Sequence, residues 1–311
     1  MALHRLTQIV MGVPNVEQTA AYYAEFGLTP GADNAFSTVD GGEQLRIVPA
    51  GHRRLVRVGV GADDADDLDR VAASLSALGI AVERDHGSVR AVDPGTQVTV
   101  QVEIAGRITQ QPTPAPPYNA PGINARPGTR APGILREEAV RPRKLGHVVL
   151  GSTDQERSQR FFQQGIGFKV SDTVPGLATF MRCSTDHHNV LVQQAPVPYL
   201  HHTSWQVDDV DEVGRGACAM LAADPARHVW GLGRHHVGSN FFWYLRDPAG
   251  NFSEYYSDLD CIIDDALWQP GVWEGARGLF NWGPPPPPSF LAPEDLAGLM
   301  TGAHSPSHQE K

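Results

Sequence analysis

Apolar residues recur along the chain in short runs with β character, and stretches with helical spacing separate these runs. In the first half, helices are expected from Asn15 to Phe26 and over residues 68–78, with Gly27 and Gly79 at their ends. Strands are expected over residues 6–13, 35–39, 44–49, 55–60, 81–84, 89–93 and 97–104. This order of elements predicts an α+β fold built from βαβββ units.

The same order returns from residue 144, which predicts two tandem modules that each curl into an incomplete barrel. A strand over residues 145–150 precedes a helix over 155–165, and further strands are expected over 176–183, 189–194 and 203–207. The acidic runs Asp63–Asp67 and Asp208–Glu212 both precede helices, and Asp93-Pro94 matches Asp247-Pro248. Superposing the halves places Gln8, Arg57 and Val100 of the first opposite His147, His202 and Glu254 of the second.

Proline-rich stretches suggest where the modules begin and end. We predict an N-terminal module without metal ligands over residues 1–107, a Pro-rich linker over 108–143 and a C-terminal catalytic module over 144–265. The aromatic and Pro-rich tail, residues 266–311, is expected to pack on the second module. Its last residues, 304–311, are expected to be disordered.

Composition narrows the function classes. The chain has 311 residues, a hydrophobic fraction of 41% and a formal net charge of −10, with no basic stripe. This composition favours a buried core and argues against nucleic-acid binding. The three widely spaced cysteines are typical of a reducing compartment. No signal-peptide pattern or membrane-length apolar run is present, so a cytoplasmic protein without membrane contact is expected.

Histidines concentrate in one part of the second module. Seven of the 13 histidines lie between His187 and Glu254, and His147 lies upstream in an apolar strand. Two histidines and one carboxylate on neighbouring strands suit an open ferrous site, so we expect His147, His202 and Glu254 to bind a metal. A lone core histidine is more often only hydrogen-bonded, and Glu254 could instead be solvated with Tyr255 inward.

In His201-His202, alternation along a strand would turn the two rings to opposite faces. We predict that His202 is the metal ligand of this pair, because it stands two residues after a leucine, as His147 does. His201 is then expected to be a surface or supporting residue.

Four motifs together resemble the type I extradiol ring-cleaving dioxygenases of the vicinal oxygen chelate superfamily. They are Leu145-Gly146-His147, Leu200-His201-His202, Gly233-Arg234-His235 and the run from Asp247-Pro248 to Glu254. The resemblance implies an Fe(II)-dependent enzyme that opens a catecholic ring with O₂ to a semialdehyde or keto acid, in degradation of aromatic compounds. It also implies a homo-oligomer. Mn(II) suits the same ligands. Residues 238–244 and the tail most resemble the branch acting on single-ring or alkyl-substituted catechols.

The resemblance further implies roles for residues beside the metal. His188 matches the acid/base near dioxygen, and His235 and Tyr244 match residues that hydrogen-bond the substrate hydroxyls. The alternatives are a surface histidine pair, a loop histidine and a core tyrosine. Pocket shape is expected to depend on the tail and on Phe180, Trp205, Phe241 and Trp243. Two other functions stay open: an Fe(II)/Mn(II) hydroquinone-type ring-cleaving dioxygenase of the same superfamily, and a non-catalytic module that binds aromatic ligands.

Overall fold

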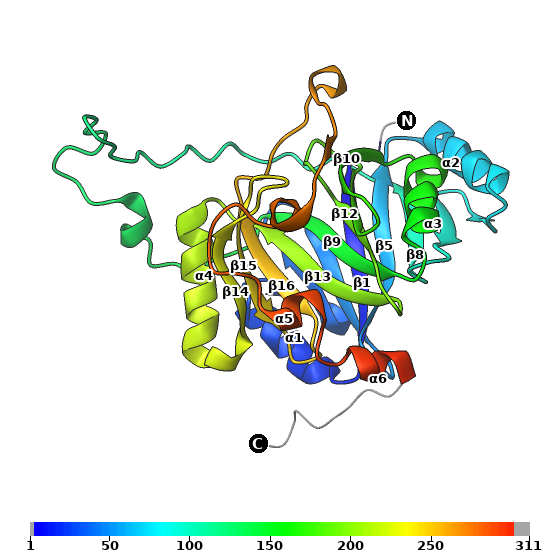
Figure 1. The fold of residues 1–311 in the computed structure, drawn as a ribbon, viewed down its shortest axis with the longest axis horizontal. Coiled ribbons are helices and arrows are strands. Elements are labelled where there is room, and N and C mark those ends of the chain that lie inside the picture. The colour runs from blue at the N-terminus through cyan, green and yellow to red at the C-terminus, as the bar shows by residue number, and fades with distance from the viewer. Residues whose placement is uncertain (1–2, 302–311) are drawn as a thin grey trace.

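Two mixed β-sheets form the framework of the protein in the computed structural model, which describes residues 3–301 (Figure 1). In order across the first sheet the strands are β2 (Thr29–Pro30), β3 (Ala35–Thr38), β4 (Gly42–Pro49), β1 (Arg5–Val13), β5 (Arg54–Ala62), β8 (Thr99–Ile104), β7 (Ser88–Val92) and β6 (Glu83–Arg84). Across the second they are β14 (His228–Arg234), β15 (Phe241–Arg246), β16 (Phe252–Ser257), β13 (Tyr199–Gln206), β9 (Lys144–Ser152), β12 (Val190–Gln194), β11 (Ala178–Arg182), β10 (Lys169–Val174) and β17 (Gly271–Val272).

The two sheets repeat one pairing scheme. In the first, β1 runs parallel to β4 and antiparallel to β5, and β5 runs parallel to β8. In the second, β9 runs parallel to β12 and antiparallel to β13, and β13 runs parallel to β16. The prediction of an α+β fold with tandem βαβββ units is therefore confirmed.

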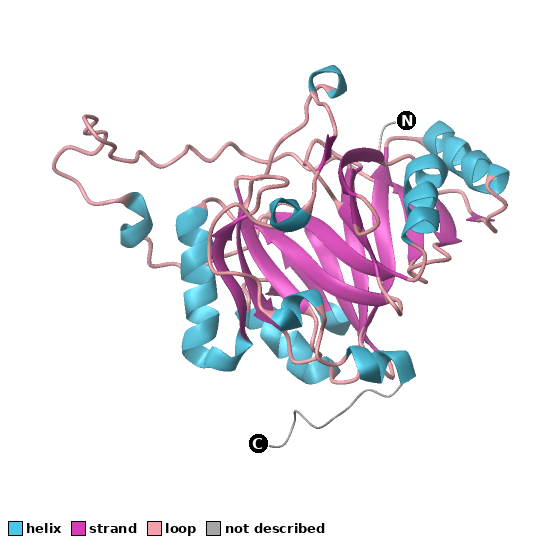
Figure 2. Cartoon of the chain, viewed as in Figure 1, coloured by secondary structure: helices cyan, strands magenta, loops and turns pink. Residues whose placement is uncertain are grey.

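Helices lie around the two sheets, as Figure 2 shows. They are α1 (Val16–Glu25), α2 (Ala65–Ala77), α3 (Gln155–Arg160), α4 (Val210–Ala223), α5 (Pro288–Leu291) and α6 (Leu296–Thr301). The helix α2 begins three residues earlier than predicted because the Asp64 side chain accepts a hydrogen bond from the backbone N–H of Asp67. The Asp209 side chain caps α4 in the same way. The acidic runs are thus helix starts.

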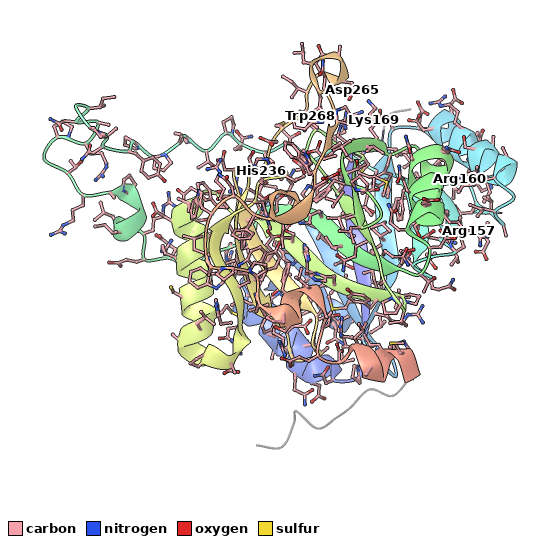
Figure 3. All side chains as sticks on the ribbon, viewed as in Figure 1. Arg157, Arg160, Lys169, His236, Asp265 and Trp268 are labelled. Carbon is pink, nitrogen blue, oxygen red and sulfur yellow. The ribbon has the colours of Figure 1, made fainter. Side chains whose placement is uncertain are left out.

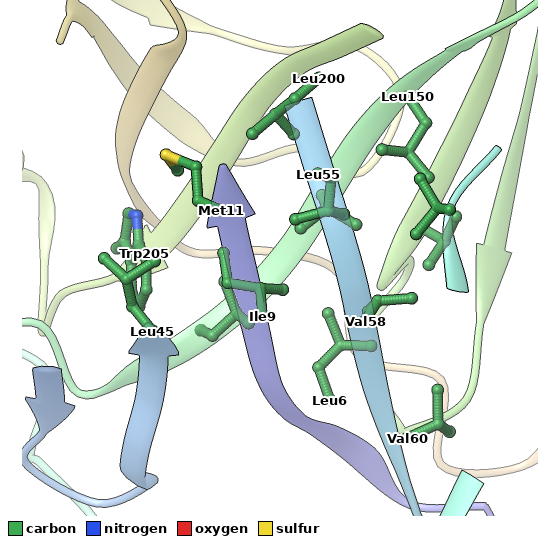
Figure 4. Close-up of a cluster of buried hydrophobic side chains, with 14 of the residues drawn as sticks. Leu6, Ile9, Met11, Leu45, Leu55, Val58, Val60, Leu150, Leu200 and Trp205 are labelled. Carbon is green, nitrogen blue, oxygen red and sulfur yellow. The ribbon is translucent and has the colours of Figure 1, made fainter. Parts of the chain in front are cut away.

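The modules share one hydrophobic core. Leu6, Met11 and Leu55 of the first sheet pack with Leu200 and Trp205 of the second (Figure 4). The helices cross over between the halves as well. Phe26, at the end of α1, stacks on Tyr255 of β16 with ring centroids 3.9 Å apart. The first module therefore packs against one face of the second sheet. The apolar surface buried there stabilises the strands that carry the histidines.

The linker leaves the sheets and returns. Residues 108–143 run as an extended excursion to the side of the molecule (Figure 1). Arg136 then forms an ion pair with Asp209 at 2.6 Å, and the backbone N–H of Arg143 donates to the carbonyl of Gln206. Among the described residues, no helix has the length and apolar character needed to cross a membrane. The predicted disordered stretch, residues 304–311, lies outside the described part of the chain.

Candidate metal centre

Three adjacent strands bring two histidines and a glutamate to one point. His147 lies on β9, His202 on β13 and Glu254 on β16, and all three are buried. Nε2 of His147 lies 3.1 Å from Oε2 of Glu254 and 3.4 Å from Nε2 of His202. In the sheet, Ser204 of β13 lies opposite both His147 and Glu254, so the strand register explains this convergence.

The donor set fits a metal cation. Glu254 is fully buried, and its Oε2 has no hydrogen bond of normal geometry within the described residues. Burial alone would raise the pKa of Glu254, but His147, His235 and His202 lower it below its usual range, so the carboxylate is charged. Burial, followed by the neighbouring His201, lowers the pKa of His202. A buried carboxylate beside imidazole rings is costly unless a cation joins them. Three ligands on one side leave further positions open.

A β-bulge decides how the two neighbouring histidines lie. Leu200 pairs with Leu150 of β9 and His202 with Val149, so His201 is the extra residue. Both rings consequently lie side by side, with their Nδ1 atoms 2.7 Å apart, and both line the same pocket. The expectation that they point to opposite faces was wrong, because regular alternation fails at a bulge. His201 is 3% exposed and is not a surface residue.

Asn240 holds the carboxylate, although the sequence suggested no role for it. Its Nδ2 donates to Oε1 of Glu254 at 3.1 Å, and its side chain is fully buried. Nε2 of His235 lies 3.7 Å from the same oxygen. Oε2 is therefore left to face His147 and His202. Asn240 lies in the loop before β15, and only the pairing of the strands brings this loop beside Glu254. The sequence alone could therefore not identify Asn240 as its partner.

A pocket opens over the three converging side chains. His188, His235 and Tyr244 line it together with His147 and His202. Its apolar wall is formed by Val149, Phe180, Leu191, Val237, Leu279 and Phe290.

His188 lies on the loop before β12 and has its own support. Its Nδ1 lies 3.0 Å from Nδ1 of His187, whose Nε2 lies 3.2 Å from Oδ2 of Asp172. The Asn189 side chain holds this loop to β9 by donating to the carbonyl of Gly146. Burial, and then His147, lowers the pKa of His188 well below its ordinary value, so His188 is neutral.

His235 and Tyr244 bond to each other across the pocket. Nε2 of His235 lies 2.8 Å from the Tyr244 hydroxyl, and its Nδ1 donates to the carbonyl of Leu279. The hydroxyl is therefore the donor to Nε2, because the other ring nitrogen carries the hydrogen. Burial, and then the charge of Glu254, raises the pKa of Tyr244 well above its ordinary value.

The predicted pocket-shaping residues are only partly correct. Phe180 lines the pocket. Trp205 is instead buried in the core shared by the modules, with its Nε1 donating to Thr203. Trp243 contacts His228, and Phe241 packs under Arg234. Phe241 and Trp243 face away from the pocket because Phe242 and Tyr244 take the inward positions of β15.

The tail packs on the second module and closes the pocket. Trp268 donates to the carbonyl of Ser171, and nearby Asp265 is ion-paired with Lys169 (Figure 3). Further on, Trp273 contacts the ring of His236 at 4.5 Å. Phe290 then reaches the pocket beside Tyr244, with ring centroids 4.7 Å apart.

The first module has a polar network where the second has the three converging side chains. Arg57 donates to Oε1 of Gln8 at 2.8 Å and to Oε1 of Gln101 at 3.2 Å. Strand register makes Gln101 the counterpart of Glu254, because Thr99 pairs with Arg57 as Phe252 pairs with His202. The sequence superposition chose Val100, one residue too early, because the turn before β8 is one residue longer.

The chain is similar to known metal-dependent enzymes. Residues 144–255 match the family model described as Glyoxalase/Bleomycin resistance protein/Dioxygenase superfamily. Metapyrocatechase 2 of Cupriavidus necator is 29% identical over 303 residues, which cover 93% of this chain and 92% of that protein. The iron-dependent extradiol dioxygenase of Rhodococcus jostii is 26% identical over 72% of this chain and 77% of its own.

A solved structure agrees in fold. The Mn(II)-bound glyoxalase from Novosphingobium aromaticivorans superposes with a TM-score of 0.73 at 26% identity, covering 91% of each chain. Residues 144–255 therefore form a domain of the glyoxalase and dioxygenase superfamily, and the relatives that match over most of the chain include a metapyrocatechase and an iron-dependent extradiol dioxygenase.

Proposed function

We propose that this protein is an Fe(II)-dependent extradiol dioxygenase that opens a single-ring or alkyl-substituted catechol with O₂ to a semialdehyde or keto acid. The observation that carries the proposal is the convergence of His147, His202 and Glu254 at the base of a pocket lined by His188 and Tyr244. A bound ferrous ion would supply adjacent positions for both catechol oxygens and for dioxygen.

The pocket walls would orient the substrate. Val149, Phe180 and Leu191 offer an apolar surface for the ring and exclude water from it. The Tyr244 hydroxyl now donates to Nε2 of His235, and it can turn to donate to a substrate oxygen, while Nε2 can accept from a substrate hydroxyl. The hydrogen bond from Tyr244 would stabilise negative charge that develops on that oxygen.

His188 would move the proton. Its Nδ1 faces His187, so its Nε2 is the atom available to the pocket. A neutral imidazole can take a proton from a catechol hydroxyl and later return it to an oxygen that leaves with the broken O–O bond. Its low pKa favours the neutral form before substrate binds.

Iron is proposed over manganese from the resemblance of the ligand motifs to the extradiol dioxygenases. The Rhodococcus jostii relative is named as iron-dependent, whereas the structure from Novosphingobium aromaticivorans is named as Mn(II)-bound. Both ions accept imidazole and carboxylate ligands. A cytoplasmic homo-oligomer stays a prediction from cysteine usage and the family resemblance.

The test is anaerobic purification with Fe(II) or Mn(II), metal analysis, and then addition of air with a panel of catechols and hydroquinones. Fe(II)-loaded protein should consume O₂ and yield a yellow ring-opened product with a single-ring catechol. A product from hydroquinones alone would favour the hydroquinone-type enzyme. Catechol binding without O₂ uptake by metal-loaded protein would leave only a binding module.

A further inference from the structure

We propose that His201 is a positioning residue for His202, and that the C-terminal tail acts on the metal centre through it. The inference rests on the proposed metal site but does not depend on the reaction that occurs there. It concerns three segments far apart in sequence: the loop containing Arg53, the bulge of β13 and the tail around Phe290.

The hydrogen-bond chain assigns the tautomers of both rings. Nε2 of His201 lies 2.7 Å from the backbone carbonyl of Phe290, and a carbonyl can only accept. Nε2 of His201 therefore carries the hydrogen, and in the neutral ring Nδ1 is an acceptor. Nδ1 of His202, 2.7 Å away, must then be the donor. This leaves the lone pair of His202 on Nε2, the atom that faces His147 and Glu254.

The surroundings of His201 keep its ring in place. The ring is enclosed by Phe290, whose centroid lies 4.8 Å away, and by Phe252 at 5.3 Å. Rotation of His201 would require the tail to move.

The two candidate histidine ligands differ in this respect. Nδ1 of His147 is buried and has no hydrogen-bond partner within residues 3–301. Partners behind a ligating histidine orient the ring and raise its basicity. Of the two, His202 is thus the histidine whose tautomer is fixed by hydrogen bonds within the protein. The tail fixes this tautomer through the Phe290 carbonyl and His201.

An ion pair from the first module secures the tail. The Arg53 guanidinium binds both carboxylate oxygens of Asp295, at 2.5 and 2.8 Å, and is only 1% exposed. It also donates to the carbonyl of Leu200, the residue before His201. Arg53 therefore ties the tail to the bulged strand, and a module without candidate ligands supports the metal centre.

The first test measures Mn(II) affinity by the loss of the free-ion EPR signal, which needs no turnover. His201→Phe keeps an aromatic ring but removes both hydrogen bonds, and it should weaken Mn(II) binding about 10- to 100-fold. His201→Asn keeps an acceptor near Nδ1 and should recover part of this loss. His201→Gln keeps only the donor to Phe290 and should not. The control His236→Phe, which replaces a ring next to Trp273, should leave affinity unchanged.

The second test asks whether the tail acts through His201. Asp295→Asn should weaken Mn(II) binding in the wild-type background and add nothing in the His201→Phe background, because both changes break one chain. Glu294→Gln removes an exposed tail ion pair with Arg246 and is the matched control. Unchanged affinity in His201→Phe, or equal effects of Asp295→Asn in both backgrounds, would overturn the proposal. Should His201→Phe fail to fold, unchanged affinity in Asp295→Asn would overturn it alone.

These measurements separate the inference from the proposed function. Weakened Mn(II) binding in the variants of a protein that opens no catechol would leave the positioning role standing and remove only the dioxygenase.

Discussion

The Arg57 guanidinium lies 3.2 Å from Oε1 of Gln101, at the positions that His202 and Glu254 occupy in the other module. A fixed positive charge thus stands where the second module gathers its three candidate ligands. Gln8, the counterpart of His147, accepts a second hydrogen bond from the same guanidinium. Equivalent positions of the same fold therefore hold a guanidinium cation in the first module and three candidate ligands for a metal cation in the second.

This relationship predicts one metal ion per chain. Arg57→Met should leave the metal content at one equivalent by elemental analysis. It should lower the free energy of unfolding by about 1–3 kcal/mol, because Oε1 of Gln8 loses its donor, whereas Oε1 of Gln101 still accepts from Arg90. A second equivalent of tightly bound metal in the wild-type protein would contradict the assignment.

Replacing His202 with Ala should abolish metal retention after gel filtration, because one of three ligands is lost. His201→Ala should still bind metal when it is supplied in excess, with about 10- to 100-fold weaker affinity. Elemental analysis after desalting separates the two results. Equal and complete loss in both variants would show that the choice of His202 as the ligand is incorrect.

Replacing His188 with Phe should leave metal and catechol affinity unchanged and lower kcat by about 10²- to 10⁴-fold, the range expected for lost acid/base help. Asp172→Asn should lower kcat less, because Asp172 reaches His188 only through His187. Anaerobic catechol titration combined with steady-state kinetics measures both effects. A rise in KM with unchanged kcat would assign His188 to substrate binding.

Asp247 predicts how stability depends on pH. Burial raises its pKa from 3.8 to about 6, although hydrogen bonds from Asn251 oppose the shift. The folded state thus holds the proton more tightly than the unfolded state. The contribution of Asp247 to the free energy of unfolding, about 3 kcal/mol, is fully present below about pH 4. It is lost as pH rises through 6. Urea unfolding of wild type and Asp247→Asn across this range should show a component missing from the variant; parallel profiles would contradict it.

The repeated order of strands and helices could be predicted because it depends on local patterns. The helix at Val16–Glu25 and the strand at Lys144–Ser152 follow from apolar spacing and end signals within a few residues. The bounds of other elements were not predicted correctly. The strand β13 begins at Tyr199 and not at residue 203, because its first half is polar and histidine-rich, and burial in the fold overrides its composition.

The metal centre was likewise predictable in part from local sequence and in part only from the fold. The types of residue for a metal centre, and their places in the repeat, were visible in the chain, and the fold brings His147, His202 and Glu254 within a few ångströms. The bulge at His201 was not visible, because a bulge is defined by pairing with β9, and that strand is about 50 residues away. The counterpart of Glu254 was missed for a related reason, since the turn before β8 differs in length by one residue.

The sequence by itself determined the fold class, the repeat and the chemical nature of the candidate ligands, because hydrophobic periodicity and residue chemistry are local properties. Only the tertiary structure decided which faces the side chains share and which groups stand behind them. Asn240 behind Glu254, and the chain from Arg53 through Asp295 and Phe290 to His201, join segments separated by up to 242 residues. Such contacts depend on how the strands pair and the tail packs, and no local pattern encodes them.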